Sequence, residues 1–130
     1  MIQRTKEEQL FWALPASKVV EILETNDRGG LSESEAERRI KVFGPNVIEK
    51  SRGVEHEIDA AELVPGDIIH LAQGDRIPAD GRLLFVNDLQ IDEAILTGES
   101  LPVSKSVDPV NAEAVIGDQY PMVFAGTLVI

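Results

Sequence analysis

The sequence of 130 residues contains no cysteine, which removes disulfides, thiol catalysis and cysteine-ligated zinc from consideration. Aromatic residues make up only 5% of the chain, so its core must be built from Val, Ile, Leu and Ala. The two histidines, His56 and His70, are far apart and lie in strand-like segments. We expect both to be ordinary, partly buried side chains, and we predict no metal site.

Positive charge is scarce as well. Twelve Lys and Arg stand against 23 Asp and Glu, which gives a formal net charge of −11. Such a surface is repelled by the phosphates of nucleic acid and by the anionic face of a membrane. We therefore expect no nucleic-acid partner, and solubility is the simplest explanation of the acidic surface.

Long hydrophobic runs are also missing. None approaches the roughly 20 apolar residues that span a bilayer, and the first residues, MIQRTKEEQLFW, lack the apolar stretch of a signal peptide. The chain is therefore expected to be soluble and intracellular.

Motifs that bind nucleotides, or that catalyse reactions through a Ser/His/Asp set, are not found. Neither G-x-x-x-x-G-K-[ST] nor G-x-G-x-x-G occurs, so we predict no cofactor site in the chain. An EF-hand in residues 75–86 is excluded, because Ile77 and Ala79 stand where the calcium loop needs oxygen ligands.

Residues 1–50 have a helical pattern. In residues 15–26 the apolar side chains share one face, and Asn26 to Gly30 end the segment. A second helix begins at Ser32, a good N-cap with Glu35 three residues later, and it ends at Gly44 and Pro45. We expect its Ile40 and Phe43 to pack on the rest of the protein.

From about residue 54 the pattern changes to short strand-like runs between Gly, Pro, Asp and Asn turns. The runs expected as strands are residues 67–72, 81–86, 89–96, 114–117 and 122–130. In the turns at 64–67 and 74–80 we expect Asp side chains to accept hydrogen bonds from backbone N–H groups. We interpret the charges of NDLQIDE (87–93) as the outer face of a strand.

The chain is therefore predicted to be mainly β with a small α part. The expected architecture is a distorted β sandwich or jelly roll in residues 51–130, carrying a short helical unit in residues 1–50.

The segment AILTGESLPVSK (94–105) places a carboxylate at the tip of a glycine turn. Gly98 permits a positive φ and a close approach by another group. Thr97 and Ser100 can hydrogen-bond the local backbone, and Glu99 projects where it could deprotonate a water. We expect Thr97–Ser100 to be exposed, with Ile95, Leu96 and Val103 anchored inward. An ordinary solvated turn remains the alternative on these residues alone.

Three segments in order, residues 60–84, 89–105 and 122–129, closely resemble the actuator domain of P-type cation-transporting ATPases. This resemblance covers about residue 58 to 130. Residues 11–48 resemble the N-terminal cytosolic segment of the calcium- and sodium-pump-like branch.

The resemblance implies a role for the loop. Such pumps transfer phosphate from ATP to an aspartate of a separate phosphorylation domain, and the actuator then brings its Thr-Gly-Glu-Ser loop to that site. Glu99 would position the water that hydrolyses the aspartyl-phosphate, and Thr97, Gly98 and Ser100 would shape the loop. ATP and Mg²⁺ are expected for the whole pump and neither for this chain. The implied partners are the phosphorylation and nucleotide-binding domains and the membrane helices.

The sequence also departs from the family. Two membrane helices that separate the segments in such pumps are absent near Lys50 and Ser51, as are the Asp-Lys-Thr-Gly-Thr motif and the nucleotide-binding domain. We expect two cytosolic segments joined directly, with residues 49–53 as an exposed connection, and no activity of this chain alone. The whole pump would place it at the cytosolic face of a membrane. Calcium is the first expectation for the ion; sodium, potassium, magnesium and protons stay open.

Two other functions stay open at this point. The chain could be an acidic β domain that binds a protein partner without a catalytic role. It could also be a stand-alone hydrolase with Glu99 as base, although no group for electrophilic assistance is evident in the sequence.

Overall fold

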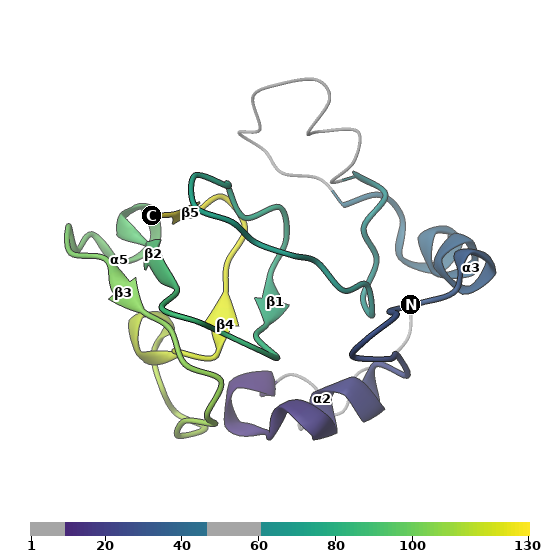
Figure 1. Ribbon diagram of the computed structural model, residues 1–130, viewed down its shortest axis with the longest axis horizontal. Coiled ribbons are helices and arrows are strands. Elements are labelled where there is room, and N and C mark those ends of the chain that lie inside the picture. Colours follow the sequence, from purple (N-terminus) through teal and green to yellow (C-terminus); the bar gives the residue numbers. More distant parts are fainter. Residues whose placement is uncertain (1–9, 47–60) are drawn as a thin grey trace.

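The computed structural model describes residues 10–46 and 61–130 (Figure 1). The first part contains the 3-10 helix η1 (Phe11–Ala13) and the helices α2 (Ala16–Ile22) and α3 (Glu33–Phe43). The second contains β1 (Gly81–Arg82), β2 (Gln90–Asp92), helix α5 (Ala94–Thr97), β3 (Val103–Ser104), the 3-10 helix η2 (Ile116–Asp118), β4 (Met122–Val123) and β5 (Leu128–Val129). The expected connection at residues 49–53 and His56 lie outside the described residues.

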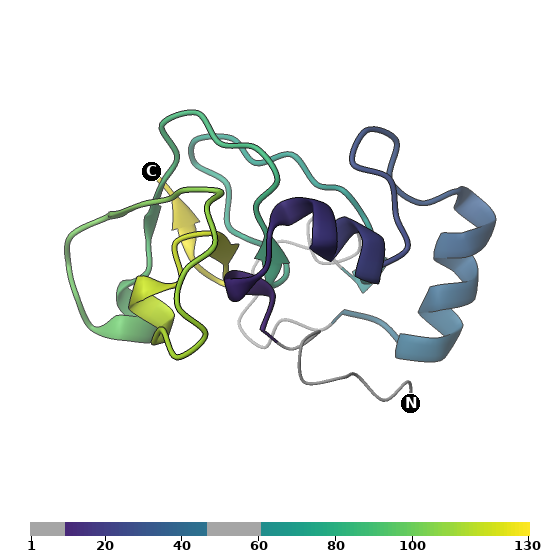
Figure 2. The same cartoon turned by 90° about the horizontal axis from the view of Figure 1, so that it is seen from below.

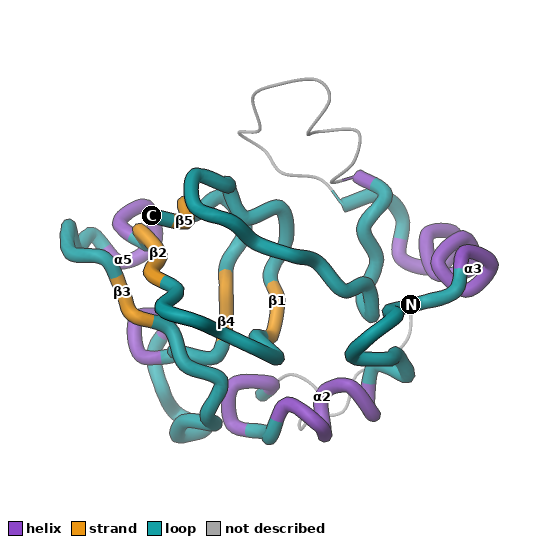
Figure 3. The backbone as a smooth tube through the Cα atoms, in the orientation of Figure 1, coloured by secondary structure: helices purple, strands orange, loops and turns teal. Residues whose placement is uncertain are grey.

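The strands of the described ranges form two small antiparallel sheets. β1 pairs with β4, and the second sheet has the order β3-β2-β5. Ile91 of the central strand lies opposite Val103 on one side and Val129 on the other. Figure 3 shows that loops, rather than strands, make up most of this part of the chain.

The expectation of a mainly β fold is therefore correct only in part. The strands are two or three residues long, and residues 67–72 form no strand. Residues 94–97 form helix α5 instead of continuing the strand, because the Glu93 carbonyl accepts hydrogen bonds from Leu96 N and Thr97 N. Residues 116 and 117, expected in a strand, belong to η2.

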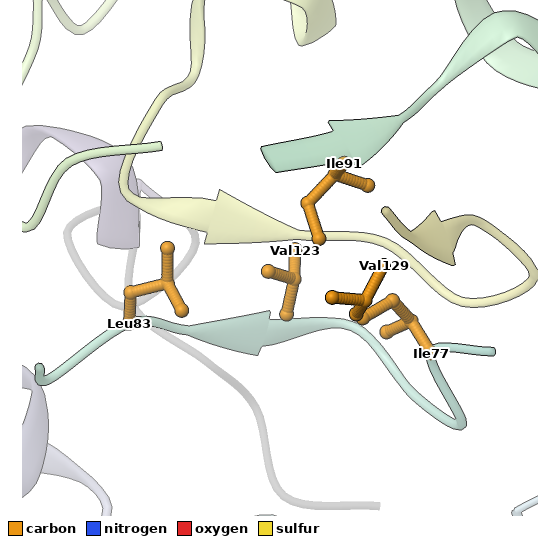
Figure 4. Close-up of a cluster of buried hydrophobic side chains, with 5 residues drawn as sticks. All are labelled: Ile77, Leu83, Ile91, Val123 and Val129. Atoms are coloured by element: carbon orange, nitrogen blue, oxygen red, sulfur yellow. The ribbon is translucent and has the colours of Figure 1, made fainter. Parts of the chain in front are cut away.

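An aliphatic core lies between the two sheets. It consists of Ile77, Leu83, Ile91, Val123 and Val129, whose side chains come from both sheets and the turn before β1 (Figure 4). Ile77 and Ile91 have no exposed surface. The core is therefore built from branched aliphatic side chains, as the low aromatic content predicts.

Helix α3 begins and ends where the sequence predicts. Ser32 Oγ accepts a hydrogen bond from Glu35 N at 3.2 Å, and Gly44 has a φ of +77° while its N–H donates to Ile40 O at 2.8 Å. The predicted contact face is wrong for Phe43, which is 38% exposed. The buried residue of this helix is Arg39 instead, because backbone carbonyls of neighbouring segments satisfy its guanidinium.

Arg39 connects three segments of the chain. Its guanidinium donates to Leu23 O at 2.8 Å, to Glu24 O at 3.1 Å and to Pro65 O at 2.7 Å. The side chain is only 6% exposed. This contact ties α3, at the end of the molecule far from α5 in Figures 1 and 2, to the end of α2 and to the turn at 64–67.

Arg82 of β1 makes a second connection. It donates to Phe11 O at 3.0 Å, to Leu14 O at 2.9 Å and to Val107 O at 2.8 Å. The helical part and the β part are therefore joined by arginine–carbonyl hydrogen bonds at two separate places.

The predicted Asp turns are confirmed. Asp67 Oδ2 accepts from Val64 N at 3.0 Å, and Asp75 Oδ2 accepts from Ala72 N at 2.8 Å.

His70 is exposed, so its expected partial burial is wrong. Within residues 10–46 and 61–130, no helix has the length and apolar character needed to cross a bilayer.

Candidate functional site

The loop that carries Glu99 starts at the end of β2. Asp92 Oδ1 accepts a hydrogen bond from Ala94 N at 3.0 Å and so fixes the first turn of α5. The short helix ends at Gly98, whose φ of +76° is left-handed and whose N–H donates to Ala94 O at 2.8 Å. No heavy atom lies within 4 Å of where a Gly98 Cβ would be. The tip is therefore open to another molecule or domain.

Thr97 braces the turn from inside. Its Oγ1 donates to Glu93 O at 3.2 Å and accepts from Glu99 N at 3.2 Å. Gly98, Glu99 and Ser100 are exposed, as predicted, and Thr97 is half-buried. The structure thus holds the backbone of Glu99 while its carboxylate faces solvent.

The apolar residues beside the tip are not anchored as predicted. Ile95 is 69% exposed and Leu96 is 44% exposed, whereas Val103 is half-buried and pairs with Ile91. The reason is α5: a helical turn after Glu93 directs these side chains differently from the extended strand that the alternating pattern predicts. Leu101 is also exposed, at 78%.

A buried ion pair lies at the base of the loop, and sequence reasoning missed it. Lys105 Nζ lies 2.5 Å from Glu93 Oε2, and both side chains are fully buried. Burial lowers the pKa of the Lys105 ammonium from its ordinary value, and the Glu93 carboxylate opposes that effect. Glu93 was interpreted as part of the charged outer face of a strand, which is wrong. The sequence signal for its burial is Lys105, a lone lysine directly after β3, the strand that pairs with β2.

Metal binding finds no support in the described residues. They contain no group of three or more His, Cys, Asp or Glu side chains that could hold an ion. What the loop offers chemically is one exposed carboxylate on a braced turn, suited to accept a proton from a water.

Comparison with known protein families finds two matches. A family described as "P-type ATPase actuator domain" matches residues 45–130, and one described as "Cation transporter/ATPase, N-terminus" matches residues 11–55. The loop and its buried base both lie inside the first match.

Similar proteins include calcium-transporting ATPase 1 of Lactococcus lactis, 39% identical over 121 residues, and a calcium-transporting ATPase of Listeria monocytogenes, 40% identical over 121 residues. Each alignment covers 93% of this chain and 13% of the relative. The endoplasmic reticulum calcium ATPase of Aspergillus fumigatus is 49% identical over 81 residues, covering 60% of this chain and 8% of that protein. The chain therefore spans a small part of the length of these relatives.

Proposed function

This chain belongs to the P-type ATPase actuator domain family, and from that premise we propose that its Thr97–Ser100 loop promotes hydrolysis of the aspartyl-phosphate of an ATP-driven cation pump. The observation that carries the proposal is the exposed, left-handed Gly98 turn that presents Glu99 outward on a braced backbone. The names of the similar pumps favour calcium as the transported ion.

The proposed step is a hydrolysis. Glu99 accepts a proton from a water as the water oxygen attacks phosphorus. The bond between phosphorus and the aspartate oxygen breaks, which releases inorganic phosphate and restores the aspartate carboxylate. Gly98 lets the loop approach the phosphate closely, and the Thr97 hydroxyl holds the Glu99 backbone during the attack.

The other parts of the reaction belong to other domains in this proposal. ATP and Mg²⁺ are expected for the whole pump and not for this chain, whose sequence has neither G-x-x-x-x-G-K-[ST] nor G-x-G-x-x-G. They would be held by the phosphorylation and nucleotide-binding domains, which are its partners together with the membrane helices. The domain would work at the cytosolic face of the membrane, and this chain alone would hydrolyse nothing.

The same proposal covers the two membrane helices that pumps of this family have between the segments matched by residues 1–50 and 51–130. This chain would lack them. The chain would then consist of two cytosolic segments that lie side by side in the pump. The contacts of Arg39 with Pro65 and of Arg82 with Phe11 agree with two segments that pack directly on each other.

The test uses a chimeric pump in which this chain's residues replace the matching residues of a full-length relative. Glu99→Gln keeps the shape of the side chain and removes the base, which typically contributes about 10²–10⁴-fold. We expect phosphoenzyme to form from ATP at the parental rate and to decay at least about a hundredfold more slowly. ATP radiolabelled at its γ-phosphate measures formation, and a chase with unlabelled ATP measures decay.

The control is Glu62→Gln, which neutralises an exposed carboxylate outside the loop and should leave both rates unchanged. Parental decay in the Glu99→Gln pump would contradict the proposal. It would favour a protein-binding role for this acidic domain.

A further inference from the structure

The buried pair at the base of the loop has unusual surroundings. Among the described residues, the only charge within ion-pair distance of Lys105 Nζ is Glu93, and Glu93 Oε1 has no hydrogen-bond partner there. The ring centroid of Phe124 lies 5.5 Å from Nζ. Two charges have thus been removed from water with one contact between them.

Such a pair contributes little to the free energy of folding. Desolvation of two charges offsets their attraction unless further hydrogen bonds satisfy the remaining atoms, and apolar replacements of similar volume are often neutral or stabilising. Its effect is better sought in geometry, because it fixes the distance between two chain segments.

Those segments are the two ends of the loop. Glu93 lies between β2 and α5, and Lys105 directly follows β3, so the pair closes residues 94–104 at their base (Figure 1). The same Glu93 accepts at its carbonyl from Thr97 Oγ1, and Thr97 Oγ1 in turn accepts from Glu99 N. An unbroken chain of contacts therefore leads from Lys105 to the backbone of Glu99.

We propose that Glu93 and Lys105 are positioning residues: their buried ion pair sets the place of the Glu99 carboxylate through Thr97. This inference rests on the proposed function and deepens it. Neither residue touches the phosphate or the water; each acts through the loop that it anchors.

The test compares Glu93→Met, Lys105→Met and the double variant E93M/K105M in the chimeric pump and in the 130-residue chain. A single variant leaves one buried charge without its partner and should lower the melting temperature, whereas the double variant should melt close to the parent. Phosphoenzyme decay should be slowed in all three by about ten- to a hundredfold, since a catalytic group displaced on the order of 1 Å can cost about 10²-fold. Formation of phosphoenzyme should not change.

The double variant separates positioning from stability. Parental decay together with a parental melting temperature in E93M/K105M would overturn the inference, because the place of Glu99 would then not depend on the pair. Lys41→Met, an exposed lysine on α3, is the matched control and should alter neither property.

The Glu99→Gln pump distinguishes the two proposals. If Glu99→Gln slows decay and E93M/K105M does not, only the positioning role is wrong. If Glu99→Gln also decays at the parental rate, the proposed function fails first.

Discussion

Three charged side chains, Arg39, Glu93 and Lys105, are almost fully buried in a chain with few aromatic residues. Each is held by specific partners: backbone carbonyls and the Glu35 carboxylate for Arg39, and the opposite charge for the other two. Glu99 is the reverse case, an exposed carboxylate on a fixed backbone. In the proposed mechanism, the buried Glu93–Lys105 pair positions the loop and the exposed Glu99 accepts the proton.

Glu35 should make the stability of the helical part depend on pH. Hydrogen bonds from Arg38 and then Arg39 lower the pKa of Glu35 from 4.5 to about 2. The folded state therefore binds fewer protons than the unfolded state between these values, so this contribution is complete above pH 4.5 and is lost as the pH falls toward 2. Thermal melts of the parent and of Glu35→Gln should converge over that range.

The control for this titration is Val42→Ala, an exposed position without a titratable group on the same helix. Its difference from the parent should not change between pH 5 and pH 2. A constant difference between the parent and Glu35→Gln across the same range would contradict the assignment to this cluster.

Glu99→Gln should leave the stability of the chain almost unchanged, because its side chain is exposed at the loop tip. We expect a change of less than about 0.5 kcal/mol in the free energy of unfolding, measured with urea. Ile91→Ala, in the core, should lose about 2–5 kcal/mol in the same experiment. A large loss for Glu99→Gln would make Glu99 a structural residue.

The elements are short, and glycines in the left-handed region end or turn several of them. Gly98 ends α5, Gly44 ends α3, and Gly66 lies in the turn beside Arg39. A Cβ at Gly98 or Gly44 would meet nothing within 4 Å, whereas one at Gly66 would collide with Arg39 Nη1 and approach Leu31. Glycine is therefore required for its backbone conformation at Gly98 and Gly44. At Gly66 it is also required because a side chain would not fit.

Substitution by Ala should separate the two requirements. Gly98→Ala should cost about 1–2 kcal/mol, the penalty of a left-handed residue with a side chain. Gly66→Ala should cost clearly more, because its φ is +106° and Arg39 must also move. Urea unfolding measures both, with Gly44→Ala as the control for conformation alone; equal costs at all three positions would contradict the steric role of Gly66.

The whole molecule depends on contacts between its helical and β parts. Arg39 and Arg82 supply these contacts through carbonyls that are distant in sequence. Trp12 adds another, since its Nε1 donates to Ala112 O at 3.1 Å. The two parts therefore behave as one packed body in the described ranges, rather than as separate units on a tether.

Arg39→Met should destabilise the whole chain. It leaves the carbonyls of Leu23, Glu24 and Pro65 without this donor, and a buried unsatisfied group costs about 1–3 kcal/mol. We expect a loss of about 2–4 kcal/mol in urea unfolding. Arg28→Met, at an exposed side chain, should change stability by less than about 0.5 kcal/mol. Similar losses for the two variants would mean that Arg39 does not hold the parts together.

Features that depend on residues a few positions apart could be predicted from the local sequence. The N-cap at Ser32, the helix end at Gly44, the Asp67 and Asp75 turns and the exposed turn around Gly98 were all predicted and are all present. Their hydrogen bonds close within two to four residues, so the local sequence contains both partners. The family resemblance depended likewise on ordered local motifs.

The burial of charges and the exposure of apolar residues could not be predicted in this way. Arg39 needs the carbonyl of Pro65, and Glu93 needs Lys105 across the sheet; neither partner can be inferred from spacing. The strands are shorter than predicted, and Ile95 and Leu96 are exposed, because pairing across the sheets and the helical turn of α5 override the alternating pattern. Burial and strand length are properties of contacts between distant segments, and those contacts exist only once the chain has folded.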